Sequence, residues 1–180
     1  NNLASSLLYL DRLEEAEPLF REALEIRKTN LGRNHPYVAN TMNNLGRLLF
    51  DLGNLAAADS LLSGAIDVWT QAVGPNYPRI SSGLVNLALV AEEQRDIERA
   101  VSVMARALEI DSLALPADHP YVAQDCLELG RLTLAAGRTD EALKYLMQAH
   151  KIYLENAGPD DEDTRHAAKL IAQANEKSDS

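Results

Sequence analysis

The sequence predicts an all-α protein, built as a solenoid of stacked antiparallel helix pairs. A pattern of large and small apolar residues recurs every 42 residues, without an insertion anywhere along the 180-residue chain. Each copy of the pattern contains two stretches in which apolar residues recur at the spacing of an amphipathic helix. One such helix pair cannot bury its own apolar face, so successive copies are expected to stack on one another.

The repeat is visible as sets of equivalent positions that keep the same size of side chain. One set is large and aliphatic, the next is small, and two more are alanine throughout. These sets are Leu3, Leu45, Leu87, Leu129 and Ile171; Ala4, Gly46, Ala88, Gly130 and Ala172; Ala16, Ala58, Ala100 and Ala142; and Ala23, Ala65, Ala107 and Ala149. Paired helices approach closely only where side chains are small. We therefore expect Gly46 and Gly130 to face the set of Ala58 and Ala142, and that set to be almost fully buried.

Nine helices follow from this pattern, each ending where glycine, proline or a polar pair interrupts the apolar spacing. The expected ranges are 1–10, 13–30, 36–52, 55–73, 78–94, 97–114, 120–136, 139–157 and 162–176. They group into repeats of approximately 1–34, 35–76, 77–118 and 119–160, followed by a capping helix at 161–177. We expect one domain over residues 1–180, excised from a longer protein because the chain begins within the pattern.

The first two helices each carry an irregular feature. Helix 1–10 contains leucines of an interrupted pattern, Leu3, Leu7, Leu8 and Leu10, and we expect it to fray or to mediate self-association. Helix 13–30 contains Pro18 beyond its first turn, where proline removes one intrahelical hydrogen bond and can bend the helix.

The first helices of the next three repeats have the clearest start signals. Pro36, Pro78 and Pro120 fall in the first turn, where the missing N–H costs nothing. The residues expected as N-caps before these helices and the last one are Asn34, Asn76, Asp118 and Asp160.

The second helix of each repeat follows a short turn. These turns fall at Asp11-Arg12, Gly53-Asn54, Arg95-Asp96 and Gly137-Arg138. The last helix resembles the first helix of a fifth repeat, and its polar end "NEKSDS" predicts a capping role.

Composition excludes several classes of function. The net charge is −10, and the acidic excess lies mainly in the C-terminal half. Nucleic acids and anionic membrane surfaces are therefore unexpected partners. The single Cys126 excludes an internal disulfide framework, and no run of apolar residues is long enough to span a membrane. We expect a cytoplasmic location.

Side chains that could carry chemistry do not form a catalytic or metal-binding constellation in the sequence. His35 and His119 lie in different repeats, and each is expected to pack at a helix start. Cys126 is expected to be a core thiol rather than a nucleophile, because it falls on the apolar face of its helix. Trp69 is expected to pack between repeats rather than to bind a ligand. We therefore expect neither an enzyme nor a bound metal or cofactor.

The repeat resembles the tetratricopeptide repeat (TPR), whose pattern is aromatic-x-x-Leu-Gly-x-x-Tyr, then Ala-x-x-x-Phe and a small residue. The second repeat matches it at Met42, Leu45, Gly46, Leu49, Ala58, Leu62 and Ala65. The usual period is about 34 residues. The longer period here is similar to that of kinesin light chain repeats. This resemblance implies a right-handed superhelix in which the first helix of each repeat lines a concave groove.

The groove positions that the resemblance implies carry both polar and apolar residues. They are Asn2, Asn44, Arg47, Phe50, Val85, Asn86, Leu89, Leu127, Glu128 and Arg131. Asn44 and Asn86 could hold the main chain of an extended peptide, because an amide both donates and accepts hydrogen bonds. Arg47 and Arg131 would favour an acidic or polar residue of that peptide. The family's lysine clamp for a C-terminal carboxylate is absent from these positions.

Two hypotheses of function follow. The first is a scaffold that binds a partner peptide or protein segment in the groove. The alternative is an architectural or self-association module within a larger protein, without a groove ligand.

Overall fold

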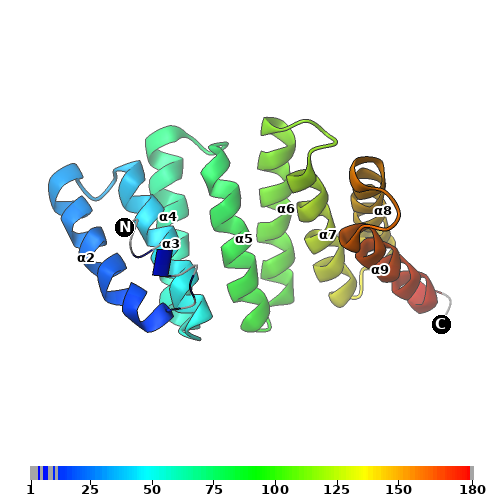
Figure 1. Cartoon of the computed structure of the whole chain (residues 1–180), viewed down its shortest axis with the longest axis horizontal. Helices are drawn as coiled ribbons and strands as arrows, with labels where there is room; N and C mark the ends of the chain where they lie inside the picture. Colours follow the sequence, from blue (N-terminus) through cyan, green and yellow to red (C-terminus); the bar gives the residue numbers. More distant parts are fainter. Residues whose placement is uncertain (1–3, 5, 8–9, 11, 179–180) are drawn as a thin grey trace. The chain divides into compact units, whose positions relative to one another are not determined.

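The computed structural model describes residues 4, 6–7, 10 and 12–178. Within this part the chain is helical, with no strand (Figure 1). The eight helices are α2 (Leu13–Leu31), α3 (Pro36–Asp51), α4 (Leu55–Val73), α5 (Pro78–Glu93), α6 (Ile97–Ala114), α7 (Pro120–Ala135), α8 (Thr139–Ala157) and α9 (Glu162–Ser178). They confirm eight of the nine expected helices. The ninth, residues 1–10, lies largely outside the described residues.

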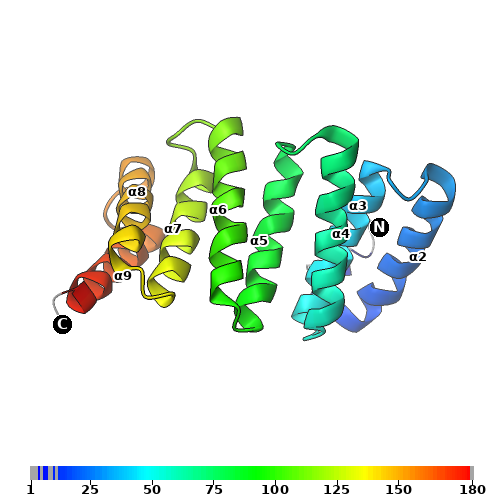
Figure 2. The same ribbon diagram turned by 180° about the vertical axis from the view of Figure 1, so that it is seen from behind.

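The helices form two compact units, residues 1–95 and residues 96–180. In the first unit α2 packs on α3, α3 on α4 and α4 on α5, and α3 also contacts α5. In the second unit α6, α7, α8 and α9 follow the same order, and α7 also contacts α9. Within each unit consecutive helices run antiparallel, as both views show (Figures 1 and 2). This arrangement is the stacking of helix pairs that the repeat predicts.

The turns inside the repeats explain why glycine occurs at two of them. Gly53 and Gly137 follow the first helix of their repeats with φ of 77° and 79°. Arg95 takes the equivalent place with φ of 63°, the one positive φ of a non-glycine residue in the described part of the chain. A left-handed conformation costs a residue with a Cβ roughly 1–2 kcal/mol. The turn geometry is therefore kept even where the sequence does not favour it.

The expected N-caps at the proline helices were wrong by one residue. The caps are His35, Tyr77 and His119, directly before the prolines, and the Nδ1 atoms of both histidines accept a hydrogen bond from the N–H two residues later. Because proline has no N–H, the first free backbone donor belongs to the following residue, which the imidazole can reach. The two histidines thus have the helix-start role that was expected of them.

At α9 the cap is Asp161 rather than Asp160. The Oδ1 atom of Asp161 accepts hydrogen bonds from the backbone N–H groups of Asp163 and Thr164, at 3.0 and 3.2 Å. Asp160 instead pairs with Arg165 at 3.3 Å. The expected capping of the whole array by α9 stays a prediction.

The alanine set predicted to be buried is fully buried: Ala16, Ala58, Ala100 and Ala142 have no exposed surface. Gly46 and Gly130 face leucines one turn further along the partner helix. A Cβ on Gly46 would lie 2.8 Å from Cγ of Leu62 and 3.4 Å from the carbonyl oxygen of Ala58. A Cβ on Gly130 would lie 2.7 Å from two side-chain atoms of Leu146 and 3.2 Å from its backbone nitrogen. Both glycines therefore lie where the two helices of their repeat approach each other closely.

The two glycines are expected to differ in their tolerance of alanine. At Gly46 only the Leu62 side chain has to move, so the gain in helix propensity of about 1 kcal/mol largely offsets the strain. At Gly130 the backbone of α8 also has to shift, so Gly130→Ala is expected to destabilise the protein by about 1–2 kcal/mol more than Gly46→Ala. Chemical denaturation of the two variants measures this difference. Equal stabilities would show that α8 adjusts freely on α7.

Candidate functional site

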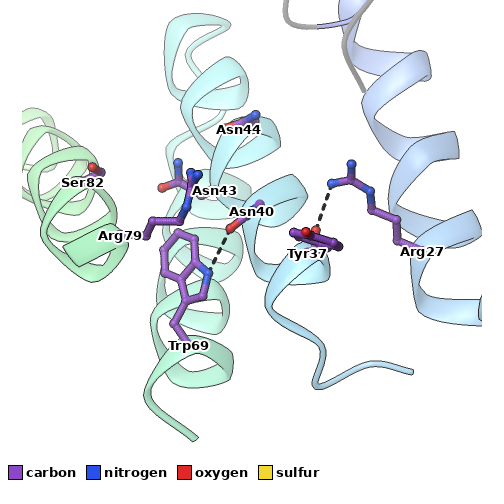
Figure 3. Close-up of a pocket in the computed structure, with 8 residues that line it drawn as sticks. All are labelled: Arg27, Tyr37, Asn40, Asn43, Asn44, Trp69, Arg79 and Ser82. Atoms are coloured by element: carbon purple, nitrogen blue, oxygen red, sulfur yellow. Dashed lines mark hydrogen bonds between the residues drawn. The ribbon is translucent and has the colours of Figure 1, made fainter. Parts of the chain in front are cut away.

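The first unit contains a hollow of about 280 Å³ with a polar lining, contributed mainly by α3 and α5 (Figure 3). We call it the Asn–Arg pocket. It is lined by Arg27, Tyr37, Asn40, Asn43, Asn44, Trp69, Arg79 and Ser82.

Helix α3 supplies half of the lining because of its helical spacing. Tyr37 precedes Asn40 by three residues, and Asn43 and Asn44 follow Asn40 by three and four, so these side chains share one side of the helix. The opposite side of α3 carries the buried Leu45 and Leu49 that pack in the core. The amphipathic pattern that builds the core therefore also gathers three amides at the surface.

Arg27, near the end of α2, is held in place by α3. Its guanidinium donates hydrogen bonds to the carbonyl oxygen of Tyr37 at 3.0 Å and to the hydroxyl of Thr41 at 2.6 Å. It also lies 5.8 Å from the centre of the Tyr37 ring, an additional favourable contact for a cation. Both hydrogen bonds use one terminal nitrogen, so other N–H donors of the guanidinium remain for a ligand.

Trp69 forms the floor of the Asn–Arg pocket. It is only 1% exposed, and its indole N–H donates a hydrogen bond of 3.1 Å to the Oδ1 atom of Asn40 (Figure 3). Its ring lies against Gly83 of α5, where a Cβ would be 3.1 Å from the ring. Trp69 therefore packs between repeats, as expected. This hydrogen bond also orients the Asn40 amide so that its oxygen faces the indole, and its NH2 group remains as a donor for a ligand.

Arg79 and Ser82 are exposed on the first turns of α5 and close the pocket on the side opposite Arg27 (Figure 3). Within the described part of the chain, Arg79 has no ionic partner. The lining thus contains two guanidinium groups and no carboxylate, although the protein has a net charge of −10. A site of this kind favours an anionic group with several hydrogen-bond acceptors.

The structure separates the two asparagines that were expected to act together. Asn44 lines the pocket and makes no hydrogen bond to any described residue. Asn86 instead links α5 to α3, because its Nδ2 donates to Oδ1 of Asn43 at 3.2 Å. Its own Oδ1 accepts a long hydrogen bond of 3.5 Å from Arg47.

The other expected groove residues are only partly free. Arg47 pairs with Asp51 at 3.1 Å and lies 5.8 Å from the centre of the Phe50 ring. Val85 and Leu89 on α5 are half-buried. In the second unit, Leu127 is buried, and Glu128 pairs with Arg131 at 3.0 Å. Asn2 lies outside the described residues.

Sequence reasoning missed several residues of the pocket, above all Arg27 and Arg79. Both lie outside the middle of the first helices, where the resemblance places the groove. One signal was available: Arg27 and Trp69 are 42 residues apart and so hold equivalent positions in successive repeats. Their equivalence could have indicated that both meet the next helix.

The remaining candidate for reactive chemistry in the sequence is Cys126, on α7. Cys126 is fully buried, and burial raises the pKa of its thiol to about 12, so the thiol stays protonated at neutral pH. This confirms the expected core thiol.

Among the described residues no three His, Cys, Asp or Glu side chains cluster as a metal site would require. None of the described helices is long and apolar enough to cross a membrane.

Comparisons with known proteins agree with this architecture. Profiles of the tetratricopeptide repeat match residues 1–62, 37–112 and 126–163. The chain therefore belongs to the tetratricopeptide repeat family. No curated protein sequence matches it significantly.

Solved structures of kinesin-light-chain-like repeat proteins share the fold. One contains nearly identical TPR-like repeats of a putative kinesin light chain from Podosopora anserina. It has a TM-score of 0.86 and 20% identity, over 99% of this chain and 84% of that chain. A second structure, of a variant of that protein, gives 0.85 at the same identity and coverage. BtubC (BKLC) from P. vanneervenii gives 0.78 and 21% identity, over 98% of this chain and 77% of the other.

Proposed function

We propose that this chain is a protein-interaction scaffold that binds an extended partner segment, with an acidic side chain of that segment in the Asn–Arg pocket. Tetratricopeptide repeats are commonly scaffolds for protein–protein interaction. The observation that supports this particular proposal is the lining of the pocket, two guanidinium groups and three amides without a carboxylate.

Each part of the lining has a distinct role in this proposal. Arg27 is already oriented by Tyr37 and Thr41, so it loses little side-chain entropy when it binds a carboxylate. Arg79 is exposed and supplies the second positive charge. Asn44 donates to and accepts from the main chain of the segment. A carboxylate bound by Arg27 and Arg79 makes charge-assisted hydrogen bonds, which are stronger than those between neutral groups.

The pocket is tested best by substitutions that do not disturb the repeat packing. Asn86 is unsuitable, because its loss would also break the link to Asn43. Asn44 and Arg79 have no such structural partner among the described residues, so Asn44→Ala with Arg79→Ala is the informative variant. Arg106→Ala is the matched control, because it removes the same charge from an exposed position on α6.

We expect peptides selected from a random display library against this protein to be enriched in Asp and Glu. Their affinities, measured by fluorescence anisotropy, should fall about tenfold or more in the Asn44→Ala, Arg79→Ala variant and stay unchanged in Arg106→Ala. Peptides without acidic preference, or equal binding by the variant and the control, would contradict the pocket as the site.

The architectural alternative rests on a different observation, an apolar hollow of about 920 Å³ between α8 and α9. Its apolar lining includes Leu143, Met147, Leu154 and Ile171. An apolar surface of this kind suits contact with a neighbouring domain or a second protein. This alternative would be favoured if the Asn44→Ala, Arg79→Ala variant still binds the selected peptides while Met147→Glu abolishes association with a neighbouring domain or a second protein.

A further inference from the structure

Two acidic residues meet where α6 packs on α7 in the second unit. Asp111 lies near the end of α6, and Asp125 lies on α7 and is only 5% exposed. The charge of Asp111 and a hydrogen bond with it both raise the pKa of Asp125. Two carboxyl groups can share a hydrogen bond only when one of them carries a proton, because both are acceptors when ionised. The Oδ2 atom of Asp125 is buried without any hydrogen-bond partner.

The repeat shows that this position is a junction between successive repeats. At two of these junctions, residues 14 positions apart meet where the end of a second helix packs on the next first helix. Arg27 donates to Thr41, and Trp69 packs against Gly83. Asp111 and Asp125 occupy the equivalent places, followed by Tyr153 and Ala167. In the first pair Arg27 donates to Thr41, and in the second the Trp69 ring packs where Gly83 has no side chain. The third pair instead places two carboxyl groups, those of Asp111 and Asp125, next to each other.

We propose that Asp111 and Asp125 make the α6–α7 junction a proton-dependent joint, closed while the pair holds a proton and loosened when both carboxyl groups are ionised. The proton is taken from solvent and returned to it. Closure is favourable because the neutral acid donates a hydrogen bond to the neighbouring carboxylate. Loosening follows because two buried negative charges repel each other and lack compensation.

The other groups around Asp125 do not compensate for its charge. On α7 the neighbouring Cys126 is a buried thiol with a raised pKa, and it is neutral when protonated. Tyr153 of α8 interacts with Cys126, and its pKa is also raised, first by burial and then by nearby acids that include Asp163 of α9 and Glu128 of α7. The causes that raise the pKa of Asp125 are burial and Asp111, and no cation among the described residues offsets them. The joint therefore depends on the acid pair itself.

The direction of the pH dependence follows from the burial of Asp125. Burial, and then the charge and hydrogen bond of Asp111, raise the pKa of Asp125 from 3.8 to about 7. The folded junction therefore keeps a proton that the open chain has already released at pH 5 to 6. Its stabilising contribution is fully present below about pH 4 and is lost as the pH rises through about 7.

Hydrogen exchange of backbone amides tests this joint within the whole chain. Amides of α6 and α7 report the joint, and amides of α2 and α3 in the same molecule are the internal reference, because their Arg27–Thr41 junction has no acid. We expect the opening equilibrium of α6–α7, relative to α2–α3, to rise with pH between about 4 and 7. The rise should approach, at most, about tenfold per pH unit, the limit for release of one proton.

Variants separate a proton-dependent joint from general packing. Asp125→Asn should abolish the rise of the α6–α7 opening equilibrium with pH. If this variant folds poorly, Asp125→Ala serves the same purpose, because alanine occurs at the equivalent position, Ala167. Asp111→Asn should keep the rise but move it to lower pH, because burial of Asp125 remains. Asp67→Asn, an exposed acid on α4, is the matched control and should behave as the unmodified protein. A flat profile in the unmodified protein, or a profile unchanged by Asp125→Asn, would overturn the proposal.

Discussion

Replacing Trp69 by alanine is expected to lower the free energy of unfolding by about 3–5 kcal/mol, a large fraction of the stability of a typical domain. The side chain is almost fully buried between α3, α4 and α5. Its removal leaves a cavity where Gly83 offers no side chain to fill the space, and it leaves Oδ1 of Asn40 without its donor. Urea denaturation followed by circular dichroism measures the loss.

Trp69→Phe is the control that separates packing from hydrogen bonding. Phenylalanine keeps most of the apolar volume but cannot donate to Asn40, so a smaller cost of about 1–2 kcal/mol is expected. If Trp69→Ala leaves stability nearly unchanged but weakens peptide binding, Trp69 acts as a ligand platform and not as an inter-repeat contact. The burial of its ring argues for the packing role.

The helices could be predicted from the sequence because their signals are local. Gly53 and Gly137 permit the positive φ of the turns, and the three prolines at helix starts restrict the backbone at their own positions. Because the 42-residue period is exact, a boundary found in one repeat predicts the boundary at the equivalent position of every other repeat. Even the turn at Arg95, which lacks glycine, could be found from its distance to Gly53 and Gly137.

The buried sets were predictable for a related reason. Paired helices in every repeat meet at the same positions, so a set that stays alanine over four repeats reports a contact that allows no larger side chain. The facing partners were less accessible to this reasoning. Gly46 and Gly130 meet leucines rather than the alanines themselves, because side chains in a helix lean toward its N-terminus.

The candidate site was predictable only in part, because side-chain partners between helices depend on rotamers that a repeat period does not encode. Asn44 and Asn86 are equivalent in sequence, yet Asn44 faces the pocket while Asn86 is hydrogen-bonded to Asn43. The neighbours decide this difference. Whether Asn44 binds a peptide stays a prediction.

A single position of the repeat can carry different chemistry in different repeats, as the Asn–Arg pocket and the acid pair show. Arg27, Trp69 and Asp111 occupy equivalent places near the ends of second helices. The first two line or support the Asn–Arg pocket, and the third forms the acid pair with Asp125. The backbone of the repeat fixes the place of the side chain, and the residue type determines whether that place stabilises, binds or responds to pH.

Enlarging a side chain in the buried alanine set is the second large effect to be expected. Ala100 on α6 has no exposed surface, so Ala100→Leu has to force neighbouring side chains from their rotamers or move the helix, at a cost of about 1–3 kcal/mol. Ser102→Leu on the same helix is the matched control, because Ser102 is exposed and its enlargement meets solvent. Thermal denaturation should show a lower melting temperature for Ala100→Leu and little change for Ser102→Leu. An unchanged melting temperature for Ala100→Leu would contradict this, because close helix packing would then not explain why this position is alanine in every repeat.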